Sequence, residues 1–455
     1  MVRGKVNRSL QAASEAQRHA SRISRRRPRP SERTISDLQN QPDFIVTQMK
    51  GDLPPFNDWG NWVADHEDQK IYMYGGCRPD NEQPTSDFYC CDMRNKTWKD
   101  YTHGLYFRTP YDPFSKEEQE LQKRDLPCLH HASCTYLNLN GGPFIFIFGG
   151  HDCSKDQVTS DLIAIDLVGM CWWYVKVEGG PVNDRIYASL VGIGNSLYIF
   201  GGKKNFGDRS PCFTSYCITE YFAEHGEWRW VVCDQPYPAN VPPLGYGGKA
   251  IPVHDDKKIL LMPGRLDTVP DSTPIDLCGH STTLGQETIF FHAENRTFLR
   301  VEVLGALPRQ VSWYDMFSVT FNPPALASTS HSSNQSDPPQ KSTRRKPAST
   351  STASSTPHSS LSSHSPSVII CTWLPESDGG ITPELWQYHL PPEEKMTCLQ
   401  LRDKIWNLDL DLQTFVVVAN RIFLLGNEGY CPDKSSDNTV FDTCVEILLT
   451  GTMHG

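Results

Sequence analysis

A short apolar run that ends in a pair of glycines recurs along this chain. A run of this kind, rich in aromatic and β-branched residues, predicts a buried strand, and glycine lets the strand end abruptly through a backbone with positive φ. One such strand constrains little, but its repetition predicts a repeat architecture. The copies are FIFIFGG at 144–150, IYMYGG at 71–76, LYIFGG at 197–202, ILLMPG at 259–264 and two eroded versions, IICTWLP at 369–375 and IFLLGN at 422–427.

Each copy belongs to a longer unit in which four strands are predicted. A short strand precedes the apolar run, and a second strand ending in an aspartate follows it, as at Asp92 and Asp166. A final strand carries an aromatic residue, which in the first two units stands 22 residues after the doublet. These repeat aromatics are Trp98, Trp172, Trp228 and Phe298.

The pattern resembles the kelch repeat, whose units form the blades of a β-propeller like the central domain of galactose oxidase. The resemblance covers residues 43–451 and implies an all-β fold, a six-bladed kelch-type propeller of four-stranded antiparallel blades. A single twisted sheet cannot cover both of its faces, and stacking blade on blade buries them. The repeat glycines are Gly75, Gly76, Gly149, Gly150, Gly201, Gly202, Gly264 and Gly426.

Closure of the ring makes a specific demand on the two ends of the repeat region. The last unit ends soon after 441–449 and lacks a further strand, while residues 43–63 resemble the junctions between units. We therefore expect residues 44–49 to supply the outer strand of the last blade.

The remaining segments are polar. Residues 1–42 carry ten Lys and Arg against three Asp and Glu, and we expect them to be disordered. An insertion at 103–129 joins the first two blades, with a short helix expected in SKEEQELQKRD (115–125). A Ser/Thr/Pro-rich insertion at 326–366 within blade five is expected to be disordered. It is either a phosphorylation segment or a tolerated insertion, and 452–455 form a C-terminal tail.

Charge and cysteine content point to a protein of the cytoplasm or nucleus. The whole chain carries a net charge of −10, so its body is acidic, which argues against a nucleic-acid-binding fold. No apolar run of about 18 residues and no signal peptide are visible. The 15 cysteines contain no CxxC pair, which favours a reducing compartment. The basic residues 25–29 form either a nuclear localisation signal or a solubilising tail.

Motifs of catalysis are missing from the sequence. It has no P-loop, HExxH or GxSxG motif, and no glutamate has an aspartate four residues later, as the ExxxDxxxH arrangement of kelch-class specifier proteins requires. His130 and His131 are adjacent, and strand alternation would point them to opposite faces. We expect no catalytic residue, no metal site and no cofactor. Cys77 and Cys153 follow their glycine doublets and are either reactive thiols or small buried residues.

Recognition is expected in the loops, which differ strongly while the strands repeat. The resemblance implies a non-catalytic scaffold or adaptor that binds a protein or peptide at the channel mouth; an enzyme acting on a carbohydrate or small molecule is the alternative. Neither a BTB nor an F-box domain is recognisable, so a ubiquitin-ligase, cytoskeletal or signalling partner rests on the resemblance alone. The candidate partner-binding residues are Arg78, His151, Lys203, Arg209, Arg265 and Tyr430.

Overall fold

The regular elements of the described residues are β-strands. Among the residues that the structure describes, the strands form six sheets of at least four strands and one small three-stranded sheet. None of these residues forms a helix long and apolar enough to cross a membrane. The computed structural model describes residues 44–55, 57, 60–78, 83–108, 122–206, 212–241, 244, 247–253, 257–262, 287–305, 313–320, 366–375, 381–390, 395–399, 410–428 and 440–448.

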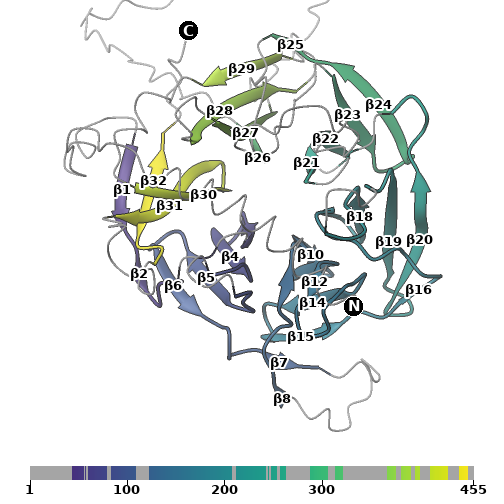
Figure 1. The fold of residues 1–455 in the computed structure, drawn as a ribbon, viewed down its shortest axis with the longest axis horizontal. Coiled ribbons are helices and arrows are strands. Elements are labelled where there is room, and N and C mark those ends of the chain that lie inside the picture. The colour runs from purple at the N-terminus through teal and green to yellow at the C-terminus, as the bar shows by residue number, and fades with distance from the viewer. Residues whose placement is uncertain are drawn as a thin grey trace, which may run out of the picture.

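The six larger sheets are numbered by the order of their innermost strands in the chain and lie around a common axis (Figure 1). Sheet 1 contains β3 (Asn61–Asp65), β4 (Lys70–Tyr74), β5 (Phe88–Asp92), β6 (Thr97–Asp100) and β2 (Lys50–Gly51). Sheet 2 contains β10 (Ser133–Leu139), β11 (Gly142–Phe148), β14 (Leu162–Asp166), β15 (Cys171–Tyr174), β7 (Tyr106–Phe107) and β8 (Gln122–Lys123). Sheet 3 contains β17 (Ser189–Ile193), β18 (Ser196–Phe200), β19 (Ser215–Phe222), β20 (Glu227–Pro236) and β16 (Val177–Glu178).

The second half of the chain continues the arrangement. Sheet 4 contains β21 (Lys249–Val253), β22 (Lys258–Met262), β23 (Glu287–His292) and β24 (Thr297–Glu302). Sheet 5 contains β26 (Trp313–Thr320), β27 (Pro366–Pro375), β28 (Ile381–His389), β29 (Lys395–Leu399) and β25 (Leu304–Gly305). Sheet 6 contains β30 (Leu410–Val418), β31 (Arg421–Glu428), β32 (Thr443–Ile447) and β1 (Phe44–Gln48). The small sheet contains β9 (Leu129–His130), β12 (His151–Asp152) and β13 (Gln157–Val158).

The outer edges of four sheets depart from the expected four antiparallel strands. The short strands β2, β7, β16 and β25 each pair in parallel with the last strand of a sheet. They come from the segments that lead from one sheet to the next. An uncovered edge strand would expose unpaired N–H and C=O groups, and these junction strands satisfy part of that edge.

The N-terminal strand joins the C-terminal sheet. β1 pairs antiparallel with β32, with Phe44 opposite Ile447 and Gln48 opposite Thr443. The amide of Met49 extends the ladder by donating to the carbonyl of Asp442 at 2.6 Å. Residues 44–49 therefore lie on the outer edge of sheet 6, the position that the sequence assigned to them.

The hydrophobic core consists of separate clusters, each lying between two neighbouring sheets. Five of the six clusters in the described residues join consecutive sheets, and the sixth joins sheet 1 to sheet 6. Phe146 of sheet 2, for example, meets Trp228 of sheet 3 with ring centroids 5.1 Å apart. The innermost strands contact one another in the order β3, β10, β17, β21, β26 and β30, and β30 contacts β3 again.

The repeat aromatics lie in these clusters. Trp98 and Trp172 are each only 1% exposed, and Trp228 is also buried. Trp98 packs with Phe423 of sheet 6, and Trp172 packs with residues of sheet 1. Phe298 is partly buried and packs against Phe291 at 4.9 Å. Each outer-strand aromatic thus fills the space between its own sheet and the preceding one.

The glycine doublets allow the chain to turn where neighbouring backbones come close. All six glycines of the first three doublets have positive φ. A Cβ on Gly149 would stand 2.5 Å from the carbonyl oxygen of Arg185, which leaves no room for another residue. Gly426 differs, because it lies inside β31 and the strand continues to Glu428. Gly264 lies outside the described residues.

The segments predicted to be irregular are described only in part. Within 103–129, residues 106–107 and 122–123 form β7 and β8, which pair with each other beyond β15. The helix expected in 115–125 is wrong at Gln122 and Lys123, because these two residues are in a strand. Residues 1–42, 326–365 and 452–455 lie outside the described residues.

Candidate functional site

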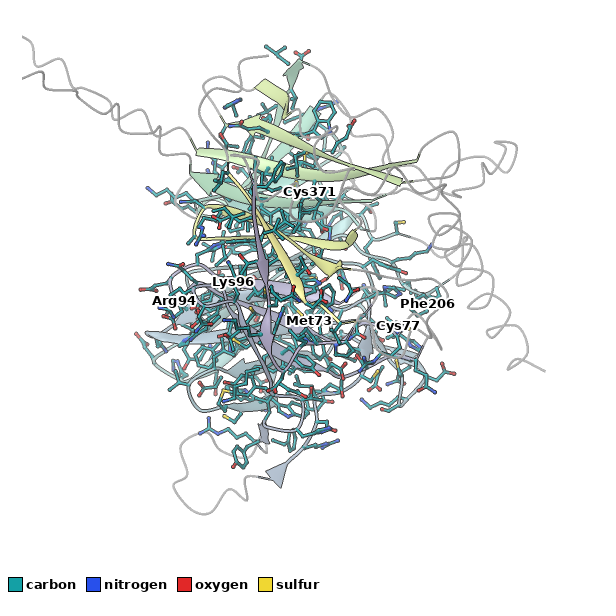
Figure 2. All side chains as sticks on the ribbon, turned by 90° about the vertical axis from the view of Figure 1, so that its left-hand side faces the viewer. Met73, Cys77, Arg94, Lys96, Phe206 and Cys371 are labelled. Atoms are coloured by element: carbon teal, nitrogen blue, oxygen red, sulfur yellow. The ribbon has the colours of Figure 1, made fainter. Side chains whose placement is uncertain are left out.

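The residues that follow the first three glycine doublets gather on one face of the molecule. Cys77, after the first doublet, and Phe206, after the third, lie on the same side in Figure 2. Arg94 and Lys96, in the turn between β5 and β6, lie on the opposite side. We call the side that carries Cys77 and Phe206 the doublet face.

Arg78 lies on this face but already has an ionic partner. Its guanidinium pairs with the carboxylate of Asp87 at 2.8 Å, and its side chain is 30% exposed. The amide of Asn57 donates to the same carboxylate at 3.3 Å and to the carbonyl of Gly75 at 3.3 Å. Arg78 therefore helps to fix the first doublet, and only part of its guanidinium faces solvent.

Lys203 does not have the exposed position expected for a partner-binding residue. It is buried, 5% exposed, and its backbone forms a two-way bridge with Ile186, at 2.9 and 2.8 Å. Gly201 and Gly202, which precede Lys203, have positive φ and turn the chain back toward the junction before sheet 3. Lys203 and Ile186 can therefore form this pair of backbone hydrogen bonds. Arg209, Arg265 and Tyr430 lie outside the described residues, so their roles remain predictions.

His151 begins a tight hairpin in place of an open loop. It forms β12 with Asp152, and β12 pairs with β13 on one side and with β9 on the other. The His151 ring is 13% exposed and stands 3.3 Å from the carboxylate of Asp156. The pKa of His151 is raised, chiefly by a hydrogen bond with the side chain of Cys153.

The turn of this hairpin, residues 153–156, is held by the buried carboxylate of Asp152. One carboxylate oxygen accepts from the amide and hydroxyl of Ser154, at 2.9 and 2.6 Å, and from the amide of Lys155 at 3.2 Å. The other pairs with the Lys155 ammonium at 2.8 Å. These hydrogen bonds to the Asp152 side chain take the place of the strand-to-strand hydrogen bonds that residues in a turn cannot form. They therefore hold the turn of the hairpin in one conformation.

An aromatic cluster lies beside the hairpin. The rings of His131 and Tyr187 have centroids 4.1 Å apart, and the Tyr187 hydroxyl is hydrogen-bonded to Nε2 of His131 at 3.1 Å. Phe206 stands 5.5 Å from His131 and 5.2 Å from His151, edge-on to both rings. Burial lowers the pKa of His131, so its ring is neutral at pH 7. The four rings form a partly exposed apolar surface, which we call the aromatic cluster.

The sequence did not reveal this cluster, although one signal was present. Tyr187 and His131 occupy the same position in their units, two residues before β17 and β10. Both have positive φ, 56° and 53°. The expected separation of His130 and His131 is also wrong, because left-handed His131 breaks the alternation and the two ring centroids lie 5.3 Å apart.

Two thiols lie at the edge of the same small sheet. The amide of Cys153 donates to the carbonyl of Cys128 at 3.1 Å, and their side chains are hydrogen-bonded. That bond, together with one from His151, lowers the pKa of Cys153, whereas the pKa of Cys128 is raised. Both thiols are partly exposed, whereas Cys77 is buried.

The buried side chain of Arg185 supports the third glycine doublet. Arg185 is fully buried and donates to the carbonyl of Gly201 at 2.9 Å. Its guanidinium pairs with Asp234 and lies 4.2 Å from the ring centroid of Phe213. The ion pair thus ties the junction before sheet 3 to the last strand of that sheet.

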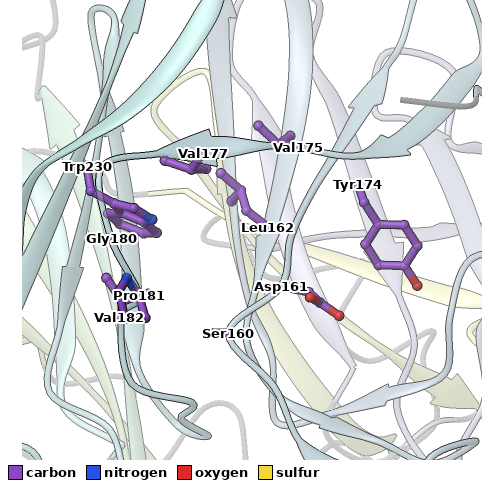
Figure 3. A pocket seen from close by; sticks show the side chains of 10 residues that line it. All are labelled: Ser160, Asp161, Leu162, Tyr174, Val175, Val177, Gly180, Pro181, Val182 and Trp230. Carbon is purple, nitrogen blue, oxygen red and sulfur yellow. The ribbon is translucent and has the colours of Figure 1, made fainter. Parts of the chain in front are cut away.

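Two shallow cavities lie elsewhere on the described residues. One, of about 180 Å³, lies between sheets 2 and 3 near Leu162, Tyr174 and Trp230 (Figure 3). Asp161 is the charged residue that lines it. The other, of about 400 Å³, lies near Tyr216 and has Arg296 as its charged residue.

No set of three or more His, Cys, Asp or Glu side chains is arranged to hold a metal ion in the part of the chain that the structure describes. The histidines of the doublet face make contacts with rings and thiols instead. The chemistry that the described residues of this face offer is ring stacking, hydrogen bonding and a thiol of lowered pKa.

Comparison with known proteins identifies the repeat. No family model matches the chain. It is 25% identical over 176 residues to human Kelch domain-containing protein 3, a match that covers 38% of this chain and 40% of the relative. It is 30% identical over 142 residues to the mouse Rab9 effector protein with kelch motifs, with 31% and 30% covered. The repeat of this chain is a kelch repeat.

The matches are partial. The chain spans about a third to two fifths of the length of the Kelch domain-containing protein 3 relatives that it matches. A further relative is an enzyme, the N-(sulfonatooxy)prop-2-enimidothioate sulfolyase of Thlaspi arvense, 24% identical over 191 residues, with 41% of this chain and 48% of the relative covered. The relatives thus include an effector protein and an enzyme, and the kelch relatives together with the all-β structure imply a β-propeller.

Proposed function

We propose that the protein is a non-catalytic interaction module that binds a peptide segment of a partner protein on its doublet face. The observation that carries the proposal is the aromatic cluster of His131, His151, Tyr187 and Phe206. Rigid aromatic side chains supply large contact areas at a low entropic cost, and they are enriched at the energetic centres of interfaces. The Asp152-held hairpin keeps one side of this surface in a fixed position.

The scaffold for this surface would be a closed, six-bladed propeller. Three observations support the proposal: the pairing of β1 with β32, the sheet 1 to sheet 6 cluster, and the contact between β30 and β3. A closed ring leaves no unpartnered first or last sheet and would hold all the loops of one face rigidly.

The charged residues have a secondary role in this proposal. Arg78 contacts the carboxylate of Asp87, and His151 contacts that of Asp156. These carboxylates offset the positive charge that the two side chains can present at the rim of the aromatic cluster. Rim charges steer encounters and set orientation more than they add affinity. Lys203 is buried and is assigned to the fold.

A peptide selection tests the proposal with the full-length chain. A library of random displayed peptides is selected on the protein, and the affinity of the enriched peptides is measured by fluorescence anisotropy. We expect Tyr187→Ala and Phe206→Ala to weaken binding by about 30-fold, the size of a hot-spot loss. Arg94→Ala, on the opposite side, is the matched control and should bind as the wild type does. Failure to enrich any peptide, or equal binding by all four proteins, would contradict the proposal.

A further inference from the structure

The two thiols of the small sheet stand directly opposite each other. β9 and β12 pair antiparallel, with His130 opposite His151 and Leu129 opposite Asp152. The same register places Cys128 opposite Cys153, and the 3.1 Å bond from the amide of Cys153 to the carbonyl of Cys128 continues the ladder. Directly opposite residues joined by ladder bonds have Cα atoms about 5.5 Å apart. This separation is within the range of about 4.4–6.8 Å that a disulfide requires.

The histidines of the two strands lie on the same side of the sheet as the thiols. Side chains alternate along a strand, so His151 and Cys153 share one face, and their partners His130 and Cys128 share it too. Asp152 points to the other face, where it holds the turn. The thiol of Cys153 therefore has a second thiol and an imidazole as fixed neighbours.

The charge state of this group favours nucleophilic attack. Hydrogen bonds from Cys128 and His151 lower the pKa of Cys153. The pKa of His151 is raised by the same contact, which favours a protonated ring beside the thiolate. Low-pKa, accessible cysteines next to a second cysteine are the ones that peroxides oxidise.

We propose that Cys128 and Cys153 form a hydroperoxide-reactive site, in which Cys153 is oxidised first and Cys128 resolves it to a disulfide. The Cys153 thiolate attacks one peroxide oxygen, the O–O bond breaks, and the proton of His151 goes to the leaving hydroxide to give water. The Cys128 thiol then attacks the sulfur of the Cys153 sulfenic acid. Its proton leaves with the hydroxyl group as a second water. The two thiols lose two electrons, and hydrogen peroxide gains them.

Peptide mapping of the full-length protein after exposure to hydrogen peroxide tests the site. Under non-reducing conditions, we expect a peptide that joins Cys128 to Cys153, and a reductant should separate it. In Cys128→Ser the sulfenic acid cannot be resolved, so Cys153 should accumulate a dimedone adduct. Cys153→Ser should show neither product. His151→Ala should slow the loss of the Cys153 thiol by about tenfold or more, because the leaving hydroxide loses its proton donor.

Cys233 provides the matched control, since it is exposed and lies far from this sheet in the last strand of sheet 3. Desolvation raises its pKa, so it should stay reduced at the peroxide concentrations that oxidise Cys153. Oxidation of Cys233 before Cys153, or a disulfide from Cys128 to another cysteine such as Cys77, would overturn the proposal. The outcome does not depend on what the doublet face binds, because the readout is the bond itself.

Discussion

The backbone amide of Tyr187 donates to the carbonyl oxygen of His131 at 3.0 Å, while the side chains of the two residues are joined by a hydrogen bond of 3.1 Å. The amide of Gly247 donates in turn to the carbonyl of Tyr187 at 3.1 Å. The three residues stand two positions before the innermost strands of sheets 2, 3 and 4. All three have positive φ. Neighbouring sheets are therefore linked at this point by backbone groups, and the aromatic side chains are carried by the linked positions.

Substitution of Arg185 tests whether the junction before sheet 3 supports the doublet face. Replacing it with methionine keeps most of the apolar stem but leaves the partly buried carboxylate of Asp234 without its cation. Removing one partner of a buried pair should lower the free energy of unfolding by about 3 kcal/mol. Urea denaturation measures the change.

The control for Arg185 is an ion pair on the surface of the same sheet. Arg229 pairs with Glu227 at 3.0 Å, with both side chains more than 40% exposed. Arg229→Met should change the free energy of unfolding by less than about 1 kcal/mol. Equal losses in the two variants would mean that Arg185 does not stabilise the junction through its burial.

Gly150→Ala tests the close approach at the second doublet. Gly150 has φ of +95°, and an added Cβ would stand 2.9 Å from both the Cβ of Ala132 and the carbonyl oxygen of His130. Left-handed backbone alone costs a non-glycine residue about 1–2 kcal/mol. The clash with backbone should add to this, so we expect a loss of more than about 2 kcal/mol in urea denaturation.

Gly180→Ala separates the free-energy cost of the left-handed backbone from the cost of the clash with a neighbouring strand. Gly180 has φ of +116°, but its added Cβ would meet nothing within 4 Å. This variant should show the backbone cost alone, about 1–2 kcal/mol. If Gly150→Ala costs no more than Gly180→Ala, the neighbouring strand moves freely and the doublet is not a tight contact.

The thiol of Cys153 should stay reactive at a lower pH than an ordinary cysteine thiol does. The groups that face it are Cys128, His130 and His151, and the hydrogen bond from Cys128 makes the largest contribution in lowering its pKa to about 5. The thiolate is the nucleophile, so alkylation by iodoacetamide should stay fast between pH 7 and 6 and fall as the pH passes below 5. Peptide mass spectrometry after brief labelling measures the rate at each cysteine.

Two comparisons decide whether the neighbours cause this behaviour. Cys233 is more exposed, yet its raised pKa should make it slow at pH 7 and faster as the pH rises. Cys128→Ala removes the neighbouring thiol donor and His151→Ala removes the imidazole, and both groups lower the pKa of Cys153, so both variants should move the Cys153 profile toward higher pH. A wild-type profile that matches that of Cys233 would exclude an activated thiol.

The repeat was readable from the sequence because its signals are local. An apolar run, a glycine doublet and an aromatic such as Trp98 each report on one strand and its burial, and these positions agree with the sheets. The parallel junction strands were missed because β2 and β16 are only two residues long. Their pairing is set by the neighbouring sheet and not by their own pattern.

The doublet face was harder to predict because its chemistry depends on contacts between distant residues. Arg78 and Lys203 look alike as loop cations, but one pairs with Asp87 at the surface and the other is buried against a junction. Cys128 and Cys153 are 25 positions apart and become neighbours only through the register of β9 with β12. A sequence pattern shows which residues are present, whereas partner and pKa follow from the packing.

Phe44 and Ile45 provide the test of whether the N-terminal strand closes the sheet ring. The Phe44 side chain is buried, 3% exposed, in the cluster between sheets 5 and 6, whereas Ile45, the next residue on β1, is 46% exposed. Phe44→Ala should lower the free energy of unfolding by about 3–5 kcal/mol, and Ile45→Ala by less than about 1 kcal/mol. Urea denaturation of both variants measures the difference. Equal, small losses would mean that β1 lies on sheet 6 without stabilising it, which would contradict the proposed role of the N-terminal strand in closing the propeller.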